Sequence, residues 1–365
     1  YKKLSFGFNY INKNSSATTN YKSVDDKYYD RNSLWNIYFI NSYLNFNFVE
    51  NDKIKFNSKL YSRIATVGKN TVGYVIKASD STEGYQVGYY RPNQLLGLEN
   101  ILSYNGIKNL SLTAGLIGEL EWLSESFSYS YSNNQDERPN SPETPDIINN
   151  SLVSVVGQAE YKFFKYFNLT AGLRYDASSY YGNVVTPRIA LVFTKNKWGA
   201  KAMYNNAFRA PRPWDYTIGL GNPDLKPEIM DALEFSLSFN ANKYLYFQIS
   251  AYRDIISHKF VKQFINNEDW FWDNKDKVQI DGIEITTNLS KGKITAFINY
   301  SYMLSFDQDN VFLAEIAKHS GNAAITYSLT DNLSAHLGLN YIGERKNPVI
   351  ITSTNNDIID PAFVW

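Results

Sequence analysis

Residues 204–228 read YNNAFRAPRPWDYTIGLGNPDLKPE, and this stretch decides the fold. It joins two segments in which apolar and polar side chains alternate, and the loop between them is long and aromatic. After the loop, residues 233–239 are apolar at every second position, which is the period of a strand with one apolar face. The stretch is therefore expected to form two strands joined by a long loop.

The same period of two runs through the whole chain. Between Asn109 and Trp122 the even positions are mostly apolar, and the odd positions are mostly polar or glycine. The phase changes after Trp122–Leu123, which predicts a bulge that adds one residue. Further alternating segments begin at Leu169, Ile189, Leu233, Phe247, Ile294, Ala323 and Leu333. We expect about fifteen strands and the start of a sixteenth at Ala362–Trp365.

Short and long connections alternate between these segments. Tight turns rich in Asn, Asp, Gly or Lys are expected at residues 50–53, 105–109, 165–168, 195–197, 241–243, 290–293 and 330–332. Longer loops are expected at residues 11–32, 68–94, 133–150, 211–228 and 265–276. A soluble sandwich also alternates, but residues 107–131 and 244–260 exceed the ~5–6 residues of an ordinary strand. Short turns at one rim and long loops at the other are typical of a transmembrane barrel. The predicted fold is an all-β, transmembrane, antiparallel up-and-down β-barrel.

Composition excludes several classes of protein. The chain has 36 basic and 36 acidic residues, so nucleic acid is not an expected partner. It has no cysteine, which removes disulfide frameworks and Cys-ligated metal sites. Mean hydropathy is −0.38, and no apolar run reaches the ~18 residues that a spanning helix needs. The 29 Tyr and 22 Phe suit the aromatic girdles of a barrel.

The stretch at residues 204–228 resembles the hallmark segment of TonB-dependent outer-membrane receptors, whose strands carry a FRAP box followed by a GNPxLKPE box. The matching residues are Phe208, Arg209, Ala210 and Pro211, then Gly221, Asn222, Pro223, Leu225, Lys226, Pro227 and Glu228. Residues 171–176 (AGLRYD), 186–190 (TPRIA), 281–284 (DGIE) and 317–322 (AKHSGN) resemble further segments of that family, although Ala317 replaces a proline. The resemblance covers essentially all of residues 1–365.

The resemblance implies one barrel of twenty-two strands around an N-terminal plug, of which this chain would carry about 15–16. Residues 1–365 are expected to be a partial barrel domain, with the plug, the first strands and the last strands outside the chain. The first residues, YKKLSFGFNY, contain no recognisable signal peptide. Expected partners are outer-membrane lipid, the plug, the TonB energy-coupling complex and a small-molecule ligand. The expected location is the bacterial outer membrane.

The implied function is uptake of a scarce ligand. Ferric siderophores and cobalamin are expected first, with oligosaccharides, peptides or haem as alternatives. Haem is disfavoured because haem receptors of this family place a His between the two boxes, where this chain has Trp214 and Tyr216. A passive porin or an adhesive barrel is the alternative from another class. No catalytic residue, resident metal or cofactor is predicted, since three His, no Cys and no GxSxG motif nominate no nucleophile. Iron or cobalt would arrive with the ligand.

Two groups of residues are candidates for function. The candidate ligand-binding residues of the outer rim are Trp214, Tyr216, Trp270, Phe271, Trp272, Tyr90, Arg91 and His258. Their rings can stack on a ligand while Arg and Tyr serve its polar groups, although the rings could instead form a membrane girdle. The candidate lumenal residues, by strand phase, are Arg174, Arg209, Glu234, Glu284 and His336. They would either line a polar lumen or hold the plug through salt bridges.

Overall fold

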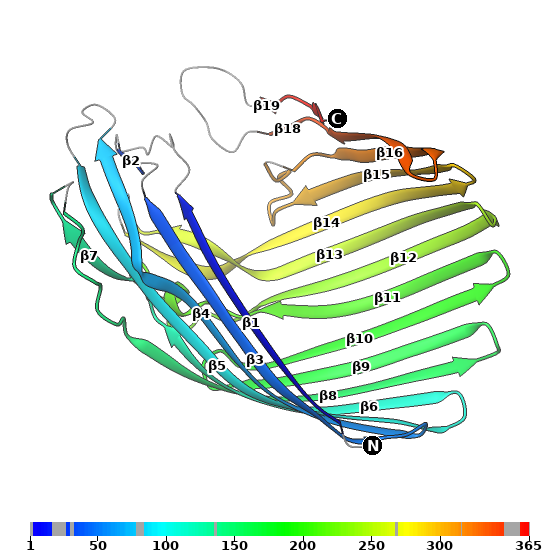
Figure 1. The fold of residues 1–365 in the computed structure, drawn as a ribbon, viewed down its shortest axis with the longest axis horizontal. Coiled ribbons are helices and arrows are strands. Elements are labelled where there is room, and N and C mark those ends of the chain that lie inside the picture. The colour runs from blue at the N-terminus through cyan, green and yellow to red at the C-terminus, as the bar shows by residue number, and fades with distance from the viewer. Residues whose placement is uncertain are drawn as a thin grey trace.

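The computed structural model describes residues 3–16, 27–29, 33–77, 84–134, 137–266, 269–314, 316–346 and 358–364. Most of these residues lie in one antiparallel sheet, which curves into a trough that stays open along one side (Figure 1). Eighteen strands form this sheet, and β18 and β19 pair with each other separately. The predicted all-β class is confirmed.

The strands are β1 (Lys3–Ser16), β2 (Lys27–Tyr29), β3 (Leu34–Glu50), β4 (Ile54–Lys77), β5 (Gly84–Ile107), β6 (Leu110–Ser124), β7 (Ser128–Ser132), β8 (Ile147–Phe163), β9 (Phe167–Ser178), β10 (Gly182–Lys195), β11 (Trp198–Arg209), β12 (Glu228–Asn242), β13 (Leu245–Phe264), β14 (Trp270–Lys291), β15 (Ile294–Phe306), β16 (His319–Thr330), β17 (Leu333–Ile342), β18 (Arg345–Lys346), β19 (Ile358–Ile359) and β20 (Ala362–Val364). One 3-10 helix, η1 (Pro213–Asp215), lies between β11 and β12.

The sheet is built up and down, because almost every strand pairs with the strands before and after it. The two exceptions are short: β2 pairs with β4, and β7 pairs with β5. Without these two, sixteen strands cross the sheet in sequence order, in agreement with the predicted number. Within the part of the chain that the structure describes, β1 pairs only with β3 and β20 only with β17, so the sheet has two open edges.

The connections form two different rims. All seven predicted tight turns are present, each two or three residues long, and they lie at the right and bottom of Figure 1. At the opposite rim the connection between β9 and β10 has three residues, and the one between β11 and β12 has eighteen. We call this opposite edge the long-loop rim.

Two predicted loops are instead paired strands. Residues 71–76 of β4 pair with residues 84–89 of β5, so the hairpin extends far past residue 68. Residues 270–273 pair with residues 261–264, so β14 begins at Trp270. These segments are rich in Val, Tyr, Phe and Trp, which favour a paired strand wherever a neighbour can align. The prediction that residues 68–94 and 265–276 are loops was wrong for most of their length.

The predicted irregularity after Trp122–Leu123 is a break between two strands. β6 ends at Ser124 and β7 begins at Ser128, and both pair with β5. The backbone N–H of Ser124 donates to the side-chain Oδ1 of Asn93 at 2.9 Å, and the pairing of β6 with β5 ends at Leu123. The predicted single-residue bulge was therefore wrong in form, although its position was right.

The two faces of the sheet have opposite chemistry. Leu233 and Phe235 are each 54% exposed, whereas Ser236 on the other face is 6% exposed. The largest fully buried side chains of the described residues are polar, among them Gln86, Asp176 and Asp215. An exposed apolar exterior and a polar interior are the arrangement of a transmembrane barrel wall.

None of the helical structure in the described residues is long and apolar enough to cross a bilayer.

Candidate ligand-binding site

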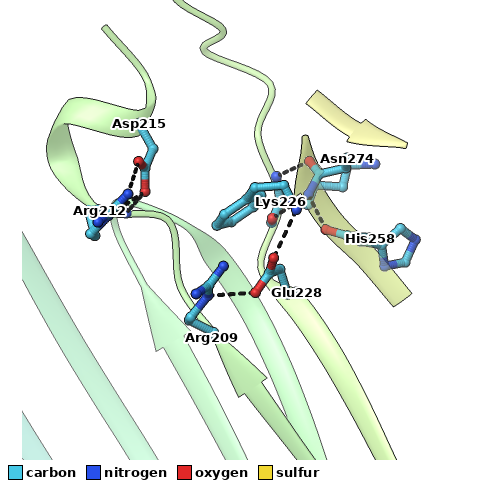
Figure 2. A network of polar contacts seen from close by, with 8 residues as sticks. Arg209, Arg212, Asp215, Lys226, Glu228, His258 and Asn274 are labelled. Carbon is cyan, nitrogen blue, oxygen red and sulfur yellow. Dashed lines mark hydrogen bonds and ion pairs between the residues drawn. The ribbon is translucent and has the colours of Figure 1, made fainter. Parts of the chain in front are cut away.

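The connection from β11 to β12, residues 210–227, contains a short helical turn that is fixed by one buried carboxylate. Asp215 is 1% exposed and accepts three hydrogen bonds from Arg212, from the backbone N at 2.8 Å, from Nε at 3.0 Å and from Nη2 at 2.8 Å (Figure 2). The hydrogen bonds to Asp215 raise the pKa of Arg212 above its ordinary value. Pro213 occupies the first helical position, where its missing N–H costs nothing. These contacts hold Trp214 in a defined place.

Trp214 is the point at which this connection meets the sheet. The guanidinium carbon of Arg91, on β5, lies 3.3 Å from the centroid of the Trp214 ring, and that of Arg212 lies 4.6 Å from it. Arg91 also lies 5.0 Å from the ring centroid of Phe127. Guanidinium groups stack favourably on aromatic faces, so this contact ties residues 210–227 to β5.

A cavity of about 310 Å³ opens beside the Arg91–Trp214 contact. It is lined by Phe39, Arg63, Ala65, Arg91, Asn93, Gln94, Leu95, Glu121, Leu123, Arg212, Pro213 and Trp214, and we name it the arginine pocket. Arg63 pairs directly with Leu95, which is 6% exposed, while the next residue, Leu96, is 41% exposed on the outside. The arginine pocket therefore lies on the inner face of the sheet.

A second hollow of about 380 Å³ adjoins the arginine pocket and shares Arg63, Leu95 and Glu121 with it. Its other charged residues are Lys59 and Glu119. Glu119 accepts a hydrogen bond from the hydroxyl of Tyr61, and Glu121 accepts one from Nδ2 of Asn150 at 2.7 Å. Of these two hollows, the arginine pocket has an excess of positively charged side chains, and the second hollow does not.

Tyr216 follows η1 and packs against Tyr180, with ring centroids 4.8 Å apart. The Tyr180 hydroxyl donates to the carbonyl oxygen of Pro213 at 3.4 Å. Burial, together with the Asp215 carboxylate, raises the pKa of Tyr216 to about 12, so its hydroxyl stays protonated at neutral pH. The Tyr216 oxygen is buried and has no hydrogen-bond partner in the described part of the chain. It is therefore an unused donor.

The second half of the connection is bound to the start of β14. The backbone N of Leu220 donates to the carbonyl oxygen of Trp270 at 2.9 Å, and Nδ2 of Asn222 donates to that of Trp272 at 2.8 Å. Gly219 has φ +69°. Its Cα lies so close to the backbone of β14 that an added Cβ would be 2.2 Å from the carbonyl oxygen of Trp270. Only glycine meets both conditions.

Asn274 binds the base of the same connection. Its Oδ1 accepts from the backbone N of Lys226 at 2.8 Å, and its Nδ2 donates to the Lys226 carbonyl at 2.9 Å (Figure 2). Nδ2 also donates to the carbonyl oxygen of His258 at 2.8 Å. One side chain thus joins residues 210–227 to both β13 and β14.

The predicted ligand-binding residues divide into separate places. Trp214 and Arg91 meet in the arginine pocket, and Tyr216 is two residues away along the chain. Trp270 and Trp272 form an edge-on pair 5.7 Å apart, with Nζ of Lys262 4.1 Å from the first ring centroid. They lie in β14 beside the second half of the connection, and not on a free loop.

The other three predicted residues do not join the arginine pocket. Tyr90 adjoins Arg91 in β5, so strand alternation directs it to the opposite face, where Nζ of Lys69 lies 4.9 Å from its ring centroid. Phe271 faces away from Trp270 and Trp272 for the same reason. His258 has φ +56° at a break in the pairing of β13 with β14, and it is exposed.

The predicted lumenal residues all lie on the polar face of the sheet by strand alternation. Arg174 binds buried Asp176, with Nη2 to Oδ1 at 2.7 Å, and Glu234 accepts from Nζ of Lys201 at 2.6 Å. Nδ1 of His336 is 2.9 Å from Oγ1 of Thr326. Glu284 lies beside Tyr252 and makes no ion pair within the described residues.

Arg209 and Glu228 close the base of the connection. Nε of Arg209 lies 2.5 Å from Oε2 of Glu228, and Oε1 of Glu228 accepts from the backbone N of Phe260 at 2.8 Å. Figure 2 shows this pair below the Arg212–Asp215 pair. The FRAP-like and LKPE-like segments are thus joined through the arginine of the first and the glutamate of the second.

Sequence reasoning missed the other three charged residues of the arginine pocket, which are Arg63, Glu121 and Arg212. Arg212 and Asp215 are three residues apart in RPWD, a spacing from which a side-chain pair in a turn could have been inferred. Arg63 and Glu121 come from distant strands and reach the arginine pocket only through the register of β4, β5 and β6. No local signal in the sequence reports that register.

Two larger hollows lie on the outer face. They measure about 760 and 700 Å³ and are bordered largely by apolar side chains such as Leu233, Phe235, Leu102 and Leu173. An apolar groove on the outside of a barrel wall is covered by lipid chains. In the described part of the chain, no group of three or more His, Asp or Glu side chains could hold a metal ion.

Comparison with known proteins agrees with this architecture. The profile of the family described as "TonB dependent receptor-like, beta-barrel" matches residues 2–365. The iron-regulated outer membrane virulence protein of Vibrio cholerae is 26% identical over 259 residues, which cover 63% of this chain and 40% of that protein. The vitamin B12 transporter BtuB of Photobacterium profundum is 28% identical over 213 residues, covering 56% of this chain and 33% of that protein. The matched part of the chain thus spans well under half the length of these relatives.

Solved structures show the same fold. The copper transporter OprC superposes with a TM-score of 0.72 at 13% identity, over 100% of this chain and 68% of that chain. The ferric citrate transporter FecA superposes with a TM-score of 0.72 at 12% identity, over 100% of this chain and 59% of that chain. Since the family profile spans almost the entire sequence, the chain belongs to the TonB-dependent receptor-like β-barrel family of the bacterial outer membrane.

Proposed function

We propose that this chain is the larger part of the barrel of an outer-membrane receptor that captures a scarce small molecule and imports it with energy from TonB. The observation that carries the proposal is the arginine pocket, a partly enclosed site with three arginines and one glutamate in its lining. It lies near the long-loop rim, on the inner face of a wall whose outer face is apolar. A site placed there would meet ligands that arrive from outside the cell.

The remainder of the receptor would come from outside residues 1–365. The open edges at β1 and β20 need further strands, because an unpaired sheet edge is not tolerated in hydrocarbon. A plug domain inside the barrel would give partners to inward-facing charges such as Glu284, which lacks an ion pair in the described residues. TonB would act on that plug.

The ligand class follows from the relatives as a proposal. One relative is named as iron-regulated and another as a vitamin B12 transporter, so a ferric siderophore or cobalamin is the first choice. The arginine pocket contains charged and aromatic groups that suit a chelated metal complex better than a plain hydrocarbon.

Uptake measurements test the receptor function. The whole gene would be expressed in a bacterium that lacks its own siderophore and cobalamin receptors, with and without a functional TonB system. We expect accumulation of radioactive iron or cobalt complexes that depends on both the gene and TonB. Equal accumulation without TonB, or steady ion conductance in planar bilayers, would indicate a passive porin instead.

A further inference from the structure

We infer that the arginine pocket binds a negatively charged ligand through carboxylate or phenolate oxygens, which deepens the proposed receptor function by naming the ligand class. The inference rests on charge balance, on an unused donor and on the geometry of the stacked guanidinium groups. It distinguishes an anionic metal complex from a neutral one such as cobalamin.

Charge in the arginine pocket is unbalanced. Its lining contains the three guanidinium groups of Arg63, Arg91 and Arg212 and one carboxylate, that of Glu121. Arg212 is neutralised by Asp215 through a two-pronged contact. Neither Arg63 nor Arg91 forms an ion pair within the residues that the structure describes. Arg63 is exposed, whereas Arg91 is half-buried, so a bound anion would compensate a charge on Arg91 that is otherwise costly to keep out of water.

Arg91 has a donor without an acceptor. Its Nε is buried and makes no hydrogen bond in the described part of the chain. Buried donors are nearly always paired, and leaving one unpaired costs more than a typical hydrogen bond contributes. An oxyanion in the arginine pocket is a suitable acceptor.

The geometry around Trp214 holds the Arg91 guanidinium ready to bind. Arg91 and Arg212 both lie over the Trp214 ring, at 3.3 and 4.6 Å from its centroid. Stacking restrains the plane of the Arg91 guanidinium and leaves its terminal N–H groups available for a carboxylate or phenolate, whereas Arg212 already donates to Asp215. Trp214 adds an aromatic surface for a ring in the ligand.

The charge pattern also limits how deep an anion would go. Below Arg63, the adjoining hollow contains Glu119 and Glu121 against Lys59 and Arg63, so the positive excess ends there. An anion would therefore rest in the arginine pocket, at the end nearer the long-loop rim. A carboxylate of the plug could supply the same chemistry, and the experiment below separates the two sources.

The test measures equilibrium binding to purified receptor made from the whole gene. The probes are the anionic iron(III) complex of 2,3-dihydroxybenzoate, ferric citrate, cationic ferrioxamine B and neutral cyanocobalamin. The variants are Arg63→Gln and Arg91→Gln, which remove charge and keep most of the volume. The control is Arg188→Gln, an inner-face arginine on β10 that contacts Gln158 outside the arginine pocket.

We expect an anionic probe to bind most tightly, with affinity that falls as salt is added. Each of Arg63→Gln and Arg91→Gln should weaken that binding roughly tenfold or more, because hydrogen bonds to charged groups are strong. Arg188→Gln should change it less than about twofold. Arg91→Lys should restore only part of the affinity, because an ammonium lacks the planar fork.

Tighter binding of cyanocobalamin or ferrioxamine B, unaffected by the two substitutions, would overturn the inference and leave the receptor function standing. Equal weakening of every probe, with a rise in single-channel conductance, would show that the arginines hold the plug, and this would also overturn it. If no probe binds and none accumulates in cells, the proposed receptor function fails together with the inference.

Discussion

Arg209 and Glu228 are directly paired residues at the ends of β11 and β12, and Nε of Arg209 lies 2.5 Å from Oε2 of Glu228. The carboxylate also binds the backbone N of Phe260 on β13, at 2.8 Å. Glu228 therefore joins three strands at the point where the eighteen-residue connection leaves and re-enters the sheet. This pair gives a structural role to the arginine of the FRAP-like motif and to the glutamate of the LKPE-like motif.

Glu228→Gln is expected to weaken the wall at this junction. Glu228 is 7% exposed, and each of its carboxylate oxygens accepts from one donor, Phe260 N or Arg209 Nε. A glutamine has one acceptor oxygen and one donor NH2 group, so it can satisfy only one of these two donors. We expect a loss of about 1–3 kcal/mol in the free energy of unfolding, the range for a buried charged hydrogen bond. Urea unfolding of both proteins in detergent measures this difference in the free energy of unfolding. Asp224→Asn, an exposed carboxylate in the same connection, is the control and should change stability by less than about 0.5 kcal/mol.

Most of the barrel wall could be predicted from the sequence, because the faces of a strand and the positions of tight turns are determined by residues that are close together in the sequence. Alternation in residues 233–239 and turn residues such as those at 196–197 fixed the faces, the turns and the number of crossings. The limits of the strands near the long-loop rim could not be predicted. Trp270 and Tyr90 are in strands because a neighbouring strand is long enough to pair with them.

The candidate site was predictable only in part, for the same reason. Trp214 and Arg91 could be named because each stands out in its own segment. Their contact at 3.3 Å, and the addition of Arg63, depend on how residues 210–227 fold against β5. That contact is a tertiary one between residues more than a hundred positions apart.

Asn274→Ala should release residues 210–227 from the wall. The substitution removes both hydrogen bonds to Lys226 and the one to the His258 carbonyl. Losing about 2 kcal/mol of local stability would raise the open population at least tenfold. Chymotrypsin cleavage after Tyr216 or Leu220, within this connection, then measures the change, provided that the cleavage rate follows the open population. Asn332→Ala, in a short turn at the opposite rim, should leave that cleavage rate unchanged.

Gly219→Ala should be more damaging than Gly182→Ala or Gly118→Ala. An alanine there would have φ +69° and a Cβ 2.2 Å from the Trp270 oxygen. Gly182 has φ +82° and open space around it, so Gly182→Ala measures the backbone strain alone, about 1–2 kcal/mol. Gly118 has a φ outside the left-handed region and open space around it, so Gly118→Ala measures the effect of the added methyl group alone. Thermal unfolding should rank the losses as Gly219→Ala, then Gly182→Ala, then Gly118→Ala; equal losses at Gly219 and Gly182 would show that the close contact is relieved freely.

Tyr216→Phe should leave the unliganded receptor as stable as before or stabilise it slightly. The hydroxyl that it removes is buried without a partner in the described residues, and deleting such a group relieves a desolvation penalty of about 1 kcal/mol. Tyr204→Phe is the matched control, since its hydroxyl donates to Oδ1 of Asp231 at 2.6 Å and its loss should cost about 1 kcal/mol. Because the pKa of Tyr216 is about 12, ligand binding between pH 6 and pH 9 should not depend on its ionisation. A stability loss for Tyr216→Phe equal to that for Tyr204→Phe would show that the Tyr216 hydroxyl already has a partner.

Ile249→Arg and Gln248→Arg place the same charge on opposite faces of one strand. Ile249 is 45% exposed on the apolar face, whereas Gln248 lies on the inner face, where it contacts Tyr246 and Ser250. An arginine facing the middle of a bilayer costs about 2–4 kcal/mol, while one facing a watery lumen costs little. We therefore expect Ile249→Arg to lower the folded fraction in lipid vesicles, measured by heat-modifiable mobility on gels, and Gln248→Arg to fold nearly as the parent does. The opposite order would mean that the apolar face of β13 does not contact lipid.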